Sequence, residues 1–199
     1  VVIGVLAIIG GIAANGQMTD GRGQVTASIA GRRGSRFDLQ VQGDIAPGRI
    51  ALLGQGSLAG RRITMPRRAV LTRGDDGWRL ARTQVSFGGG RAIASGLFGG
   101  EATEMQFAMS DMPLSLADIV LGDLALGGTA SGLVDYRRPR GGAPGGSAQV
   151  QVKGLTRSGL VLTSRPLDLA LVATLSAQTL ETRAVLRDGA VASGRMQAR

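Results

Sequence analysis

The amino-acid sequence predicts an all-β protein made of many short antiparallel strands joined by tight turns. Glycine accounts for 33 of the 199 residues, whereas its average usage is roughly 7%, and glycine is used mainly at turns and bulges. The short runs between these glycines alternate apolar with polar residues, which is the two-residue period of a strand. Aromatic residues make up only 3% of the chain, so the apolar surface is aliphatic.

The first 14 residues form the most hydrophobic stretch of the chain. This run is shorter than the roughly 20 apolar residues that a transmembrane helix needs. One interpretation is the end of a truncated spanning segment. The other is a buried hydrophobic strand pair that turns at Gly10 and Gly11, and we favour it because glycines weaken a helix.

Regular alternation of apolar and polar residues begins at Gln24. Residues 24–30 and 36–42 each place every second, apolar side chain on one face. The Gly-Arg-Arg-Gly sequence at 31–34 predicts the hairpin loop between them. Residues 49–58 repeat the pattern, with two glycines in line with the apolar residues.

Further strands are expected in the middle of the chain. Residues 67–73 and 78–87 flank a Gly-Asp-Asp-Gly turn at 74–77. Within 78–87 the apolar residues change from even to odd positions, which indicates a β-bulge. Residues 104–110 then alternate again.

Residues 113–121 differ from the rest because their apolar residues do not alternate. Pro113 stands at a suitable first position of a helix, so we expect one short helix near 113–121. Strands resume at 125–136 and at 149–155. Between them, the proline- and glycine-rich segment at about 137–147 predicts a mobile loop.

The C-terminal part contains the most regular alternation. Residues 166–176 place five apolar side chains on one face. Residues 179–186 and 190–196 are expected to pair over a tight turn at Asp188-Gly189.

A tetrapeptide recurs within this pattern. Ala94-Ser95-Gly96-Leu97 returns as Ala130-Ser131-Gly132-Leu133, and its first three residues return at 192–194. A reused strand–turn unit is typical of a solenoid-like β-structure, while chance repetition in an Ala- and Gly-rich chain is the alternative. Because both ends of the sequence fall within the pattern, we expect residues 1–199 to be one section of a longer repeat array.

The residue types present limit the chemistry. The chain has no cysteine and no histidine, which excludes thiol nucleophiles, disulfides, Cys/His zinc sites and imidazole acid–base catalysis. Lys153 is the sole lysine and precedes Gly154, so there is no phosphate-binding P-loop. The acidic residues fall mostly at predicted turns and on polar strand faces. We therefore expect no catalytic residue, metal or cofactor, and a protein that is not an enzyme.

The formal net charge of +9 is compatible with nucleic acid, anionic lipid headgroups or acidic polymers as partners. Arginine pairs at 32–33, 61–62, 67–68 and 137–138 lie at or near predicted turns. No aromatic stacking residues are interleaved with them, which argues against nucleic acid. Solvated loop charge is the simpler interpretation, and contact with anionic headgroups is the other.

Residues 110–160 contain an ordered series of motifs. A Pro-Leu-Ser-Leu segment is followed by a short hydrophobic run, by a Leu-x-Gly-x-x-Ser-Gly strand at Leu126–Gly132, and by a proline-containing break with a new β-run. Ser86–Gly100 adds a glycine-rich strand pair and Arg165–Leu171 a further repeat. Over residues 58–196 this series resembles the TamB family of envelope translocation and assembly proteins, which is related to the AsmA-like group.

The resemblance implies an elongated, repetitive antiparallel sheet curved into an open apolar groove, taco-like or solenoid-like. It implies a protein anchored in the inner membrane of a Gram-negative bacterium that reaches through the periplasm. The implied roles are phospholipid transport to the outer membrane and assembly of outer-membrane proteins. The implied partners are phospholipid acyl chains and an outer-membrane assembly protein of the Omp85 type, and no catalytic residues carry over.

The residues expected to line this groove are the alternating apolar side chains of the predicted strands. They are Val25, Ile29, Phe37, Leu39, Val41, Ile50, Leu52, Met105, Phe107, Met109, Val150, Val152, Leu167, Leu169, Leu171 and Leu175. Two other functions stay open: a scaffold that binds other chains by strand pairing, and a polysaccharide-acting β-solenoid. The latter would require clustered carboxylates and aromatic platforms, which are scarce here.

Overall fold

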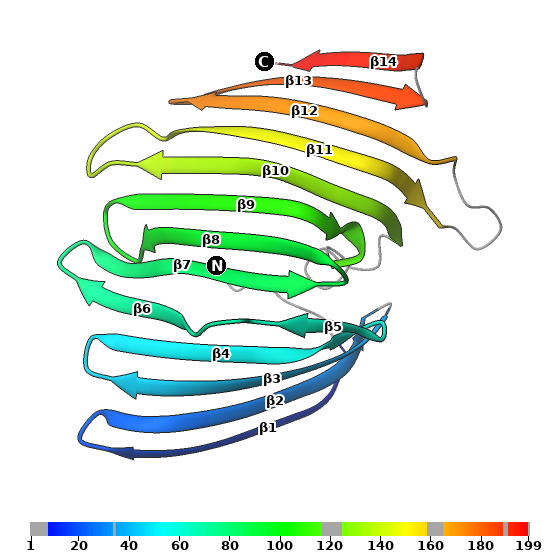
Figure 1. Ribbon diagram of the computed structural model, residues 1–199. Coiled ribbons are helices and arrows are strands. Elements are labelled where there is room, and N and C mark those ends of the chain that lie inside the picture. The colour runs from blue at the N-terminus through cyan, green and yellow to red at the C-terminus, as the bar shows by residue number, and fades with distance from the viewer. Residues whose placement is uncertain (1–7, 34, 117–124, 159–164, 189–190, 199) are drawn as a thin grey trace.

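The computed structural model describes residues 8–33, 35–116, 125–158, 165–188 and 191–198, and these form a single antiparallel sheet. Figure 1 shows a curved ladder that rises from β1 to β14, with successive strands side by side. The all-β prediction is therefore confirmed. The strands are β1 (Ile8–Thr19), β2 (Arg22–Arg33), β3 (Ser35–Ala46), β4 (Arg49–Leu58), β5 (Arg61–Thr64), β6 (Ala69–Gly74), β7 (Gly77–Phe87), β8 (Gly90–Phe98), β9 (Thr103–Pro113), β10 (Leu126–Arg138), β11 (Gly145–Arg157), β12 (Leu167–Ser176), β13 (Thr179–Asp188) and β14 (Val191–Ala198).

Strands β5 and β6 together occupy the place of one strand between β4 and β7. The second half of β4 pairs with β5, and its first half pairs with β6. Pro66 lies in the break between them, where the absence of a backbone N–H prevents a continuous ladder. The N–H of Met65 instead donates to the carbonyl of Gly54 at 3.1 Å.

The pairing register defines two faces, because residues opposite each other in adjacent antiparallel strands point to the same side. One side carries Phe37, Leu58 and Phe87, and we call it the apolar face. The other carries Arg62, Ser86 and Arg91, and we call it the polar face.

Bulges keep apolar residues on the same face where their spacing in the sequence changes. In β7, Leu80 lies opposite Gly96 and Thr83 lies opposite Ala94, with a register irregularity between them. This confirms the bulge predicted within residues 78–87. A second irregularity occurs between β9 and β10, beside Asp111, which has a φ of 47°.

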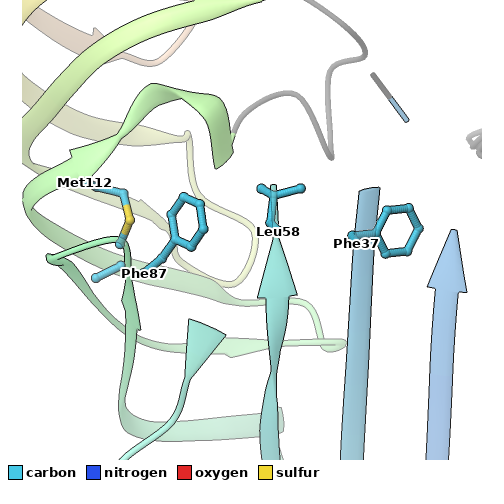
Figure 2. Close-up of a cluster of buried hydrophobic side chains, with 5 residues drawn as sticks. Phe37, Leu58, Phe87 and Met112 are labelled. Carbon is cyan, nitrogen blue, oxygen red and sulfur yellow. The ribbon is translucent and has the colours of Figure 1, made fainter. Parts of the chain in front are cut away.

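A small hydrophobic core lies on the apolar face near one end of the strands. Figure 2 shows Met112, Phe87, Leu58 and Phe37 in a row, contributed by β9, β7, β4 and β3. Leu116, the last residue of a single 3₁₀ turn (η1, Leu114–Leu116), packs against this cluster. The side chains of Leu58 and Phe87 are each only 1% exposed.

The prediction of a buried strand pair turning at Gly10-Gly11 is wrong. Strand β1 runs through both glycines, and the pairing with β2 has an irregularity between Ile9 and Gly11. Residues 11–14 are exposed, because β1 lies at the edge of the sheet. Residues 1–7 fall outside the described part of the chain. In the described ranges, the structure contains no helix with the length and apolarity needed to cross a membrane.

The structure describes only residues 113–116 of the helix predicted near 113–121. Pro113 is the last residue of β9, and only the three residues of η1 form a helical turn. Residues 117–121 fall outside the described residues. Pro113 is compatible with a strand end because its missing N–H is not required there.

Two predicted loops are shorter than expected. Residues 31–33 belong to β2, where Gly31 pairs with Phe37. At the loop predicted for 137–147, β10 continues to Arg138 and β11 begins at Gly145, so the turn spans 139–144. The remaining predicted strands are present, and β5 is an addition to them.

Candidate apolar binding face

All sixteen residues predicted to line a groove lie on the apolar face. On β2, β3 and β4 this follows from the pairs Ile29–Leu39 and Phe37–Leu58 and from their neighbours two residues away. In the C-terminal half of the sheet, on the same face, Met109 lies opposite Gly132, and Gly132 lies opposite Val150. Val150 in turn lies opposite Leu171. The alternating apolar residues of strands that are distant along the chain therefore lie on one face of the sheet.

The apolar face is only partly covered by the protein itself. Phe37 and Val152 are buried and Met105 is 54% exposed, while the other predicted residues are half-buried. Along β12, half-buried apolar-face residues alternate with exposed polar-face residues. Leu116 of η1 packs against the cluster around Phe87. Met65, in the break between β5 and β6, lies over Gly54, since a Cβ added to that glycine would meet its sulfur at 3.2 Å. Much of the aliphatic surface therefore stays accessible.

Four large apolar residues extend this face to both edges of the sheet. Ile12 and Met18 belong to the edge strand β1 and are 63% and 56% exposed. Leu180 and Met196, on β13 and β14, are 53% and 61% exposed. None of the four was predicted. The alternation of Leu180, Ala184 and Leu186 could have identified Leu180. In β1 the signal is weak, because only Ala14 and Gly16 stand between Ile12 and Met18 on that face.

Glycines on the apolar face allow neighbouring strands to approach closely. A Cβ added to Gly96 would meet the backbone carbonyl of Glu104, and one added to Gly132 would meet that of Gln149. These two glycines come from the repeated Ala-Ser-Gly-Leu tetrapeptide. In both copies the serine lies on the polar face and the glycine on the apolar face. The repeat therefore has a structural basis.

The polar face and the turns carry the charged groups. Arg68 forms an ion pair with Asp44 at 2.7 Å. Asp44 lies opposite Ala51, which is buried. Arg140, in the β10–β11 turn, reaches Asp76 at 2.8 Å and Glu101 at 3.0 Å, so it links three turns at one end of the sheet. These partners are well exposed, and such pairs contribute at most about 1 kcal/mol each.

In the part of the chain that the structure describes, no group of three or more acidic side chains is arranged to hold a metal ion. The arrangement that the geometry does offer is a long aliphatic surface, suited to contact with apolar chains. Comparison of the chain with family models finds no match, and comparisons with curated proteins and with solved structures find none either.

Proposed function

We propose that this chain is a section of a non-enzymatic cell-envelope protein whose apolar face carries phospholipid acyl chains between the inner and outer membranes. The observation that supports this proposal is the continuity of the apolar face from β1 to β14, with large aliphatic residues left exposed. Each methylene group moved from water onto such a surface contributes up to about 0.8 kcal/mol, so acyl chains would stabilise it.

The side-chain chemistry of the face suits acyl chains of different lengths. Contacts between Leu, Val, Ile or Met side chains and methylene groups have no directional requirement. All six aromatic residues lie on this face, but aliphatic side chains make up most of its apolar surface. Such a face would hold many acyl chains without strong preference for one. This property favours passage along the sheet over tight retention at one place.

The resemblance to the TamB family extends the proposal to a cellular context. The protein would be anchored in the inner membrane and would act in the periplasm. It would work with an outer-membrane assembly partner of the Omp85 type, in phospholipid transport, in assembly of outer-membrane proteins, or in both.

Charge placed on the apolar face tests this proposal. We expect the double substitution Leu169→Asp and Leu171→Asp to abolish most co-purifying phospholipid, because carboxylates there would be strongly disfavoured beside acyl chains. The measurement is native mass spectrometry followed by lipid extraction. Ala170→Asp with Val172→Asp is the matched control, since these residues alternate with the first two on the same strand and face the other side. Unchanged lipid occupancy in the first variant, with circular dichroism confirming a folded sheet, would count against the proposal.

A second candidate function is a scaffold that binds other chains by strand pairing. The specific observation is β1, an exposed edge strand of 12 residues without a charged side chain. Natural edge strands usually carry charge or proline that prevents pairing, and an unprotected edge can accept an extended peptide. A folded, lipid-free protein that binds extended peptides would favour this function.

A further inference from the structure

A basic hollow of about 700 Å³ lies where β5, β7, β8 and β9 meet near the β7–β8 turn. Its lining includes three arginines, Arg61, Arg62 and Arg91. Hydroxyl groups stand beside them in a row across the polar face, because Thr64 pairs with Ser86 and Ser86 pairs with Arg91. The row continues to Ser110, which lies opposite Arg91 on β9.

The arginines of this hollow are available for a ligand. Arg68 pairs with Asp44, and Arg140 pairs with two carboxylates. Among the described residues, no ion pair involves the arginines of the hollow. One carboxylate, that of Asp111, also lines the hollow, and the hydroxyl of Ser131 lies 3.5 Å from its Oδ1. The lining therefore keeps an excess of positive charge.

We propose that this hollow binds a phosphate group, either free or as part of a lipid headgroup. Guanidinium groups match the oxygen geometry of phosphate and can donate two parallel hydrogen bonds to it. The hydroxyls of Thr64, Ser86 and Ser110 supply further donors. A Cβ added to Gly89 would meet no atom within 4 Å, so the turn leaves open space at that position. Apart from Arg61, which lies opposite Leu58 at the end of β5, the arginines and hydroxyls of the hollow are on the polar face. The proposal does not rest on acyl-chain binding.

The test compares two variants of the whole chain that lose the same charge. Arg62→Gln with Arg91→Gln removes two arginines of the hollow. Arg183→Gln with Arg195→Gln removes two exposed arginines from the same face of β13 and β14. Titration calorimetry with inorganic phosphate, and flotation with phosphatidylcholine vesicles with and without phosphatidic acid, supply the readouts.

The first variant should weaken phosphate binding by about tenfold or more, as expected for losing charge-assisted hydrogen bonds, while the second should change it less than about twofold. Binding of both probes would assign the site to the phosphate group itself, and binding of vesicles alone would assign it to a lipid headgroup. Equal losses in the two variants would show general attraction to a basic protein and overturn the proposal, as would no binding of either probe. Tighter, Arg62- and Arg91-dependent binding of a single-stranded oligonucleotide would overturn it in favour of nucleic acid.

Discussion

At the scale of single residues, glycine has two distinct uses in this sheet. At Gly21, Gly48 and Gly60 it provides a positive φ in the turns. At Gly132 it has another use, because the neighbouring strand lies where a Cβ would stand. The first use was predictable from turn patterns. The second could not be predicted, because it depends on which strand lies next to the glycine.

Substitution of Gly132 tests the second use. We expect Gly132→Ala to lower the free energy of unfolding by about 1–3 kcal/mol, because the methyl group would force the backbone near Gln149 to move. Gly145→Ala is the control, since its Cβ would meet the carbonyl of Leu175 at an ordinary 3.6 Å. That change should be neutral or stabilising by up to about 1 kcal/mol. Denaturant titrations measure both, and equal values for the two variants would refute the close-approach explanation.

At the scale of strands, the sequence predicted which segments form strands better than it predicted where those strands end and how they pair. Residues 49–58 were predicted with the observed bounds because their alternation is undisturbed and turn residues flank them. Gly10-Gly11 was misassigned as a turn because glycine pairs also serve bulges, and the choice depends on whether the partner strand continues. The break at Pro66 went unnoticed because β5 is only four residues long.

The exposed edge strand β1 gives a prediction at this scale. Ala13 lies opposite Ser28 and therefore on the polar face. We expect Ala13→Lys to reduce concentration-dependent self-association of the protein, because a charged edge opposes pairing with another strand. Light scattering coupled to size-exclusion chromatography measures the association. Ala170→Lys, on the same face of the interior strand β12, should leave it unchanged, and an equal effect of both lysines would implicate net charge instead of the edge.

At the scale of the whole molecule, the sheet is a single described layer whose apolar face is shared by all its strands. Between bulges, alternation alone was enough to choose one face of a strand, since there a residue two positions away points to the same side. It could not order the strands or show that Met105, Val150 and Leu171 belong to one surface. That knowledge comes from the register, which also adds Ile12, Met18, Leu180 and Met196.

The continuity of this face also explains how so few fully buried side chains accompany so many strands. A sheet with one apolar side is stable when that side is covered. Here the cluster around Leu58 and Phe87 covers one region, and in the proposed function acyl chains would cover much of the rest.

The most direct test is photolabelling with a phospholipid that carries a diazirine in its acyl chain, followed by peptide mapping. If acyl chains bind the apolar face, labels should appear on its residues Leu167, Leu169 and Leu171, with little on the intervening positions of β12. Equal labelling of the two faces of β12, or no labelling of the folded protein, would contradict it.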